Sequence, residues 1–538
     1  MTSLQSAFDA LDHFAERSLH EANLPGLAIA LTDRQKLLRV LTYGLADVAA
    51  RVPVVPDTRF EIGSLGKAFT SMALLQLRDE GKVDLHAPVT QYLPWFHVQS
   101  AYPPITVHHL LNHTAGMVCG TDLAPHGLYE SWALRETQTN APPGDYFWYS
   151  NVGYKTLGFL LEALTGQPYR DVIASRVLEP LGMTQTDPAI TLATRRQTAI
   201  GYCGFYDDRP EHPRHGLVPA IWAEYGTGDG CQVSTAADMA RYLRMLLNRG
   251  QGPQGRLISQ ESFDLMTQHG VWTGEDYYGY GLAWGQVDGR TYLYHGGGST
   301  RQVSAIALDM EAGLGVVIFV NRVGRTGWAQ AAAQQALTVV RAGQRHEALP
   351  PLPPATDPSI TSNASDYAGT YRAGHRALQL IAEGGKLLLT YAGHVVALER
   401  RAQDSFYVEH PEFDFFLLEF RRHGGQVVEA LHGPHWYINE RYSGPQRFDY
   451  PAAWEAYVGH YRAHHPEPSN FRVVIRKGGL ALIFPGWVSE SLEPLGDGAF
   501  RVGEEQRSPE TLRFDTVLEG RALRAHYSGC PYYRTFTC

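Results

Sequence analysis

A serine and a lysine three residues apart form the first pattern in this sequence that could do chemistry. Ser64 and Lys67 lie in the stretch 61–70, and residues 68–80 repeat apolar side chains at helical spacing until a glycine follows. We therefore expect Ser64 to open a helix, with Lys67 one turn later on the same face. A serine hydroxyl needs a base within hydrogen-bond reach to become a nucleophile. A lysine supplies that base when an apolar site and the positive end of a helix favour its neutral amine.

The same two residue types also have an ordinary structural explanation. Serine often caps a helix, and a lysine in the first turns is usually solvated. Two further short patterns favour catalysis: Tyr149-Ser-Asn151, between a Pro-Pro-Gly turn and a helix predicted at about 152–165, and His295-Gly-Gly297, at the end of a predicted strand. The pattern Tyr-x-Asn recurs at Tyr437-Ile-Asn439 and His-Gly-Gly at His423-Gly-Gly425, so their order and setting beside the Ser-x-x-Lys unit carry the inference.

The individual residues of these patterns have structural alternatives as well. Tyr149 follows three other aromatic residues and could belong to a packed core. Asn151 could cap the following helix, and His295 could end a strand where the backbone approaches a neighbour. The residues around Asp229 could form only a loop.

The elements expected to position these residues run strands, a large helical insertion, strands and a helix over about the first 340 residues. We predict an α+β fold, in which an antiparallel sheet packs against the first and last helices and an all-helical lobe stands beside it. The predicted elements are a helix within 1–23, a hairpin of 26–31 and 36–43, a short helix within 105–116, a helix at 236–247, strands at 280–284, 291–294, 303–308 and 314–320, and a helix at 329–341.

Composition changes after this region. A proline-rich stretch within 344–362 indicates a semi-rigid linker. Beyond it Tyr367-Ala-Gly-Thr-Tyr-Arg-Ala-Gly returns as Tyr457-Val-Gly-His-Tyr-Arg-Ala-His, and both copies continue as short alternating strands with glycine turns. We therefore expect a hydrolase-type domain at 1–343 and two small antiparallel β-barrels at 363–448 and 449–538, which act as structural supports or as walls of the site.

Net charge and cysteine content indicate which classes of binding partner the protein can have. The net charge of −9 and the absence of a Lys/Arg-rich run argue against nucleic acid and anionic membranes. The five scattered cysteines show no metal-ligand spacing, and His109 and His113 lack the intervening glutamate of a zinc helix, so we expect packing or surface roles for them and neither metal nor cofactor. An amphipathic start without a signal peptide predicts a cytoplasmic protein.

Taken together, the three units in this order resemble the serine β-lactamase and penicillin-binding-protein fold. The sequence is most similar to the branch that holds class C β-lactamases, DD-peptidases and D-aminopeptidases (peptidase family S12), over about residues 5–340. The two lipocalin-like barrels resemble the layout of the bacterial D-aminopeptidases of that branch.

The resemblance implies a role for each matched residue. Ser64 would be the acylated nucleophile, and Lys67 would take or relay its proton. Tyr149 would act as base in acylation and as acid toward the leaving group, which requires a lowered pKa that two nearby cationic groups could provide. Asn151 would hydrogen-bond Lys67 and the substrate amide.

The remaining implied roles belong to the strand beside the nucleophile. His295 would contact the leaving group or orient Tyr149. The backbone N–H groups of Ser64 and Gly298 would form an oxyanion hole, with Gly297 beside them at the substrate. Class C β-lactamases have Lys-Thr-Gly where this sequence has His295-Gly-Gly297, and a histidine is only partly charged at neutral pH. We therefore expect little or no β-lactam hydrolysis and little DD-carboxypeptidase activity.

The sequence thus predicts a serine hydrolase that acts on amide bonds of small peptides or amino-acid amides, as an aminopeptidase or D-aminopeptidase would. A carboxylesterase is the alternative, and a penicillin-binding sensor and an acyltransferase are the others. The expected partner is a small molecule or a short peptide. A homo-oligomer is left open.

Overall fold

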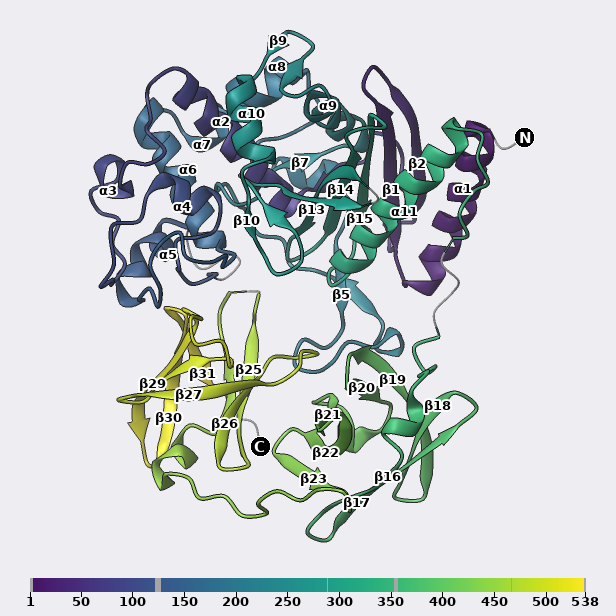
Figure 1. Ribbon diagram of the computed structural model, residues 1–538, viewed down its shortest axis with the longest axis vertical. Helices are drawn as coiled ribbons and strands as arrows, with labels where there is room; N and C mark the ends of the chain where they lie inside the picture. The colour runs from purple at the N-terminus through teal and green to yellow at the C-terminus, as the bar shows by residue number, and fades with distance from the viewer. Residues whose placement is uncertain (1–2, 121–126, 288, 353–356, 466, 537–538) are drawn as a thin grey trace. The chain divides into compact units, whose positions relative to one another are not determined.

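The computed structural model describes residues 3–120, 127–287, 289–352, 357–465 and 467–536. The chain divides into two compact units. The first consists of Met1–Cys203 with Leu217–Pro353, and the second of Gly204–Gly216 with Pro354–Cys538 (Figure 1).

The first unit is built on a nine-stranded antiparallel sheet in the order β10-β11-β12-β13-β14-β15-β1-β2-β3. The first strands of the chain thereby pair with the last strands of the unit, which confirms the α+β arrangement, and β1 and β2 form the predicted hairpin. The strands are β1 (Gly26–Asp33), β2 (Leu37–Asp47), β3 (Val52–Pro53), β10 (Val271–Trp272), β11 (Tyr277–Tyr278), β12 (Ala283–Val287), β13 (Arg290–Gly298), β14 (Val303–Asp309) and β15 (Leu314–Val320). Three two-stranded pairs lie outside it: β4 (Phe60–Glu61) with β7 (Val233–Ser234), β5 (Tyr202–Gly204) with β6 (Leu217–Pro219), and β8 (Gln251–Gly252) with β9 (Gly255–Arg256).

Both faces of this sheet are buried, and alternate residues of each central strand serve the two faces. In β1, Leu27, Ile29 and Leu31 belong to the core shared with α1 (Leu4–Glu21) and α11 (Thr326–Gln344). The intervening alanines of β1 join the core on the helical-lobe side. Strands buried on both faces are nearly continuous in apolar residues, as β14 and β15 are.

The helical lobe supplies the second face and the helices that carry the candidate residues. The helices on this side of the sheet are α2 (Gly66–Asp79), α3 (Val89–Tyr92), α4 (Val107–Leu111), α5 (Gly127–Ala133), α6 (Asn151–Thr165), α7 (Tyr169–Ile173), α8 (Glu179–Leu181), α9 (Ala236–Leu247) and α10 (Gln260–Thr267). Short 3₁₀ or π turns complete the first unit at η1 (Gly63–Leu65), η2 (Leu134–Glu136), η3 (Ala174–Leu178) and η4 (Thr194–Gln197). The turn η5 (Pro213–His215) lies in the segment 204–216, which belongs to the second unit. Across the described helices, none combines the length and the apolar run that crossing a bilayer requires.

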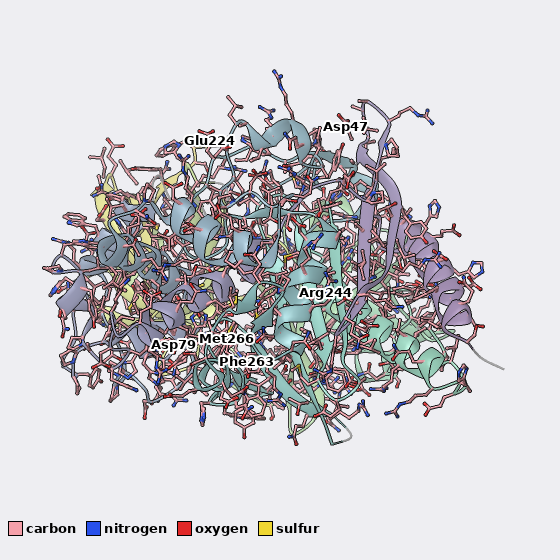
Figure 2. All side chains as sticks on the ribbon, turned by 90° about the horizontal axis from the view of Figure 1, so that it is seen from above. Asp47, Asp79, Glu224, Arg244, Phe263 and Met266 are labelled. Atoms are coloured by element: carbon pink, nitrogen blue, oxygen red, sulfur yellow. The ribbon has the colours of Figure 1, made fainter. Side chains whose placement is uncertain are left out.

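The C-terminal end of α2 is fixed by α10. Asp79 accepts hydrogen bonds from the backbone N–H of Ser259 (2.8 Å) and the hydroxyl of Ser262 (2.7 Å), at the start of α10. Phe263 and Met266 of α10 lie close to Asp79 in Figure 2, and both are buried in the core of the lobe. Because α2 also carries Lys67, this contact helps to hold the helix that presents the candidate base.

One predicted strand is interrupted. The stretch 280–284 was expected to be extended, but β11 ends at Tyr278 and β12 starts at Ala283. The intervening Tyr280 and Leu282 turn inward and are buried against the lobe. Burial of these two side chains therefore replaces the alternating pattern of a continuous strand.

The second unit contains the two predicted barrels, each closed and antiparallel. The strands of the first are β16 (Gly369–Ala373), β17 (Arg376–Glu383), β18 (Lys386–Tyr391), β19 (His394–Ala402), β20 (Ser405–Val408), β21 (Leu418–His423), β22 (Gln426–His432) and β23 (His435–Ile438). Those of the second are β24 (Gly459–Arg462), β25 (Asn470–Arg476), β26 (Gly479–Ile483), β27 (Glu490–Gly496), β28 (Ala499–Val502), β29 (Thr511–Leu518), β30 (Arg521–Tyr527) and β31 (Cys530–Arg534). Short turns lie at η6 (Ala364–Asp366), η7 (Pro411–Phe413) and η8 (Ala452–Ala456).

The sequence repeat has a structural cause in the first strand of each barrel. The hydroxyl of Tyr371 donates to the carbonyl of Tyr367 (3.0 Å), and the hydroxyl of Tyr461 donates to the carbonyl of Tyr457 (2.8 Å). Both second tyrosines are fully buried, so each hydroxyl needs a partner inside the barrel. The Tyr-x-Gly-x-Tyr motif provides that partner locally, as the carbonyl group of its first tyrosine.

The excursion 204–216 belongs to the barrel unit although its neighbours in sequence belong to the first unit. Asp207 forms a two-point ion pair with Arg462 of the second barrel (2.6 and 2.9 Å). The ring of His212 stacks on Tyr407 of the first barrel with centroids 4.6 Å apart, and its Nε2 lies 3.2 Å from Glu399. The excursion therefore bridges both barrels.

Candidate active site

The structure places Lys67 at the centre of the expected residues. Its side chain is fully buried, and Nζ lies 2.9 Å from Ser64 Oγ, 2.7 Å from Asn151 Oδ1 and 2.8 Å from the backbone carbonyl oxygen of Asp229. These positions come from three separate segments: α2, the start of α6 and the loop before β7. The Ser64–Lys67 distance is short enough for direct proton transfer.

Ser64 lies in the 3₁₀ turn η1, which directly precedes α2, so the serine is one turn before Lys67 as expected. Gly63 adopts a positive φ of 52°, and a Cβ there would lie 2.5 Å from the carbonyl oxygen and 2.7 Å from the nitrogen of Gly298. Gly230 approaches from another side, where a Cβ would lie 2.9 Å from the nitrogen of Ser64. Two glycines thus allow three backbones to meet at the serine, and the amide of Gly298 lies beside the Ser64 turn.

Tyr149 lies in the loop that leads into α6. The N-cap of this helix is Ser150, whose hydroxyl accepts from the N–H of Gly153, and Asn151 is the first helical residue, so Asn151 is not the cap. The Nζ of Lys67 is 4.9 Å from the centroid of the Tyr149 ring. Ser64, Lys67, Tyr149 and Asn151 therefore converge on one site.

His295 lies near this group, but as a neutral ring. Burial, with a smaller contribution from the charge of Lys67, lowers the pKa of His295 to about 4. Its Nδ1 lies 2.6 Å from the carbonyl oxygen of Gly296, which can only accept, so Nδ1 carries the proton and Nε2 accepts from the hydroxyl of Tyr278 (2.9 Å). The expectation that His295 is partly charged at neutral pH is wrong, because the buried strand desolvates it. It is therefore not one of the two cations expected to lower the pKa of Tyr149.

A pocket opens beside Ser64. Its lining includes two carboxylates, Glu61 and Asp229, the guanidinium of Arg301, and further polar and small residues. Glu61 is ion-paired with Arg301 and accepts from the hydroxyl of Ser299 (2.6 Å). The guanidinium of Arg301 lies 3.7 Å from the ring centroid of Trp222, which fixes its plane. The charge of Glu61 is therefore neutralised by Arg301, which also lines the pocket.

The second carboxylate belongs to a buried polar network. Asp229 accepts from the hydroxyls of Tyr225 (2.5 Å) and Thr227 (2.6 Å), and Lys155 Nζ lies 3.9 Å away. Lys155 also pairs with Glu130, and these two side chains are 1% and 4% exposed. The backbone carbonyl of Asp229 accepts a hydrogen bond from Lys67, the candidate base. The network around the Asp229 side chain therefore holds one of the three groups that contact the Lys67 amine.

We expect Lys155→Met to lower the free energy of unfolding by about 3–5 kcal/mol, since it leaves two buried carboxylates without their cation. The substitution should also lower turnover, because the Asp229 carbonyl is no longer held. Urea unfolding of K155M, E130Q and the double variant tests this: the double variant should recover part of the loss, as coupled partners do. A K155M protein as stable as the parent would contradict the network.

Several buried histidines predict how stability depends on pH. Burial lowers the pKa of His108, His295 and His432 to about 4, and that of His113 well below its usual value. The unfolded chain therefore binds more protons below about pH 6.5, so the free energy of unfolding should fall as the pH drops from there toward about 4. Urea titrations at intervals across this window measure the effect. A stability that stays constant or rises on acidification would contradict neutral histidines in the folded state.

Sequence reasoning missed several residues of this region. The segment around Asp229 looked like a loop, although it provides the carbonyl that binds Lys67. Lys155 was not singled out, yet it follows Asn151 by four residues in a largely apolar helix, and this spacing was a usable signal. Tyr278 gave no signal, because its contact with His295 depends on the pairing of separate strands.

Comparison with known proteins finds penicillin-binding proteins among the relatives of this chain. Penicillin-binding protein 4 of Amycolatopsis lactamdurans is 31% identical over 337 residues, which cover 59% of this chain and 84% of that protein. Protein flp of Staphylococcus aureus is 26% identical over 326 residues, and there this chain spans 62% of the relative's length.

Solved structures show the same fold. The octameric penicillin-binding protein homologue from Pyrococcus abyssi has a TM-score of 0.57 and 25% identity, and covers 80% of this chain and all of its own. EstCE1, described as a hydrolase with promiscuous acyltransferase activity, has a TM-score of 0.53 at 21% identity over 63% of this chain and 99% of its own, a likeness of fold alone. The beta-lactamase family profile matches residues 11–341, more than half of the sequence, and the chain belongs to this family of serine hydrolases.

Proposed function

We propose that this chain hydrolyses small carboxylic esters and amides through an acyl-enzyme on Ser64. The observation that carries the proposal is the position of Lys67 Nζ, 2.9 Å from the serine hydroxyl and held by Asn151 and the Asp229 carbonyl. A nucleophile with a buried, oriented amine beside it is the arrangement that covalent catalysis requires.

The reaction would proceed in two halves. Ser64 attacks the substrate carbonyl while its proton passes to Lys67 or, by way of it, to Tyr149. The oxyanion faces the N–H groups of Ser64 and Gly298, each typically worth about 3 kcal/mol in such sites. Tyr149 then protonates the leaving group, and water repeats the sequence in reverse to release the acid.

The neutral His295 supports weak activity toward β-lactams and C-terminal D-alanine. These substrates carry a carboxylate, and the lysine and threonine that would bind it in class C β-lactamases are replaced here by His295 and Gly296. Since the pKa of His295 is lowered to about 4 and both ring nitrogens already have partners, the ring offers a carboxylate neither charge nor a donor.

The pocket favours an uncharged acyl group. Recognition of a free α-amine calls for a carboxylate that has no cation of its own. Glu61 is paired with Arg301, and Asp229 with Lys155 and two hydroxyls. These pairings support a carboxylesterase or an amidase with a neutral acyl group.

An aminopeptidase of the D-aminopeptidase type, within peptidase family S12, is the second candidate. His295-Gly-Gly297 matches that branch, and two barrels follow the hydrolase unit as they do there. This candidate needs an acceptor for the substrate amine other than the two paired carboxylates of the pocket.

The test compares matched substrates that differ at one group. We would measure kcat/KM for p-nitrophenyl butyrate and for D- and L-alanine p-nitroanilide, and for the N-acetyl form of each of the two anilides. Faster turnover of the acetylated anilides than of the free-amine anilides supports the neutral acyl site. A clear preference for a free amine of one configuration would replace it with the aminopeptidase. Added alcohol that diverts product to a new ester would indicate acyl transfer.

A further inference from the structure

His113 stands out because its backbone is strained at a buried position. It lies just after α4, is 1% exposed, and has a φ of +60°, which side chains larger than glycine rarely adopt. Such a conformation is retained only where the surroundings enforce it, so the contacts made by this residue should explain it.

Those contacts bracket Tyr149. The carbonyl oxygen of His113 accepts from the N–H of Trp148 (2.7 Å), and its Nδ1 accepts from the N–H of Ser150 (3.0 Å). One residue therefore holds the backbone N–H groups of the residues before and after the tyrosine. The positive φ turns the carbonyl and the ring toward the same loop.

The His113 ring also packs on the tyrosine itself. The centroids of His113 and Tyr149 are 4.3 Å apart with 35° between the planes. Phe147, Tyr154 and Tyr278 surround the remaining sides at 4.9–5.7 Å. The phenol can therefore move little without breaking this contact.

The chemistry of the ring fixes its state. Because Nδ1 accepts from a backbone N–H, the proton of the neutral ring is on Nε2, which has no hydrogen-bond partner among the described residues. The ionisable groups that face it are Lys67, His295 and the tyrosines around it, and burial with the charge of Lys67 lowers the pKa of His113. A protonated ring would lose the acceptor that holds Ser150.

We propose that His113 is a positioning residue that sets the Tyr149 phenol against Lys67 by holding the backbone N–H groups of Trp148 and Ser150. The proposal rests on the proposed function, in which Tyr149 protonates the leaving group. It gives a role to a histidine for which the sequence suggested a packing or surface role. His113 itself touches no reacting atom.

The test uses two variants that both tolerate a positive φ. His113→Asn keeps an acceptor near the position of Nδ1, and His113→Gly removes it. The readout is the ratio of kcat/KM for p-nitrophenyl butyrate, whose leaving group needs little protonation, to that for ethyl butyrate, whose leaving group needs it.

We expect H113G to lose about 10–100-fold on ethyl butyrate and less than about fivefold on the p-nitrophenyl ester, part of the range for general acid catalysis. H113N should stay within about threefold of the parent ratio. Tyr149→Phe defines the full effect. If H113G does not fold, His113→Phe, which keeps the ring volume without the acceptor, replaces it.

An equal loss on both esters, or an unchanged ratio in H113G, would overturn the positioning role. Labelling of Ser64 by a fluorophosphonate probe separates the two levels of inference. If H113G is labelled normally but keeps the parent ratio of kcat/KM on the two esters, only the positioning role of His113 is refuted. A parent enzyme that is not labelled at Ser64 removes the proposed function as well.

Discussion

Replacing Ser64 by alanine should lower kcat/KM for p-nitrophenyl butyrate by about 10⁴-fold or more, the size of effect seen when a nucleophile is removed. The oxyanion donors remain, so a small residual rate above the uncatalysed reaction is expected. The fold should survive, because the turn that holds Ser64 uses no cap from its side chain. Kinetics and thermal unfolding of the purified variant measure both.

Ser175→Ala is the matched control for this experiment, since it removes an exposed hydroxyl elsewhere in the same unit. This substitution should leave kcat/KM unchanged and should change the free energy of unfolding by no more than about 0.5 kcal/mol, as is usual at exposed positions. A fully active S64A enzyme would show that another group is acylated, or that no acyl-enzyme forms.

Lys67→Met should cause the second large loss, about 10³-fold or more in kcat/KM, because the serine loses the base that takes its proton. The methionine keeps an unbranched apolar side chain in the buried site. Lys67→Arg separates charge from proton transfer, since a guanidinium keeps the charge but does not release a proton near neutral pH. Both variants should be inactive if the amine acts as a base.

The outcome that contradicts this role is activity in K67R with none in K67M. The lysine would then act only as a fixed positive charge, and the base would have to be another group. Lys82→Met, at an exposed position beyond α2, is the control for loss of a lysine as such.

Much of the first unit could be predicted because its signals are local. The helix at 236–247 and the hairpin after the first helix follow from apolar periodicity and turn residues, and the structure has both. The sequence repeat predicted two barrels. The repeat exists because a hydrogen bond from a buried tyrosine hydroxyl to a tyrosine carbonyl recurs in the first strand of each barrel. The family resemblance also singled out Ser64, Lys67, Tyr149 and Asn151, which lie together in the structure, and their catalytic roles stay predictions.

What escaped prediction depends on contacts between distant segments. The excursion 204–216 joins the barrel unit through ion pairs whose partners lie some two hundred residues away. The neutral state of His295 follows from burial between strands, and the role of Lys155 from an acid in another helix. No periodicity or spacing reports such pairings, because they are set by packing after the elements form.

The most direct test of the account is the mass of the enzyme during turnover. Acid quenching of p-nitrophenyl butyrate hydrolysis, followed by intact mass spectrometry and peptide mapping, should reveal one butyryl group on the peptide that contains Ser64. The adduct should disappear as substrate is used up, and S64A should never carry it. Rapid hydrolysis with no adduct on Ser64, or with one on another residue, would contradict the acyl-enzyme, and an adduct that never turns over would point to a penicillin-binding type of sensor.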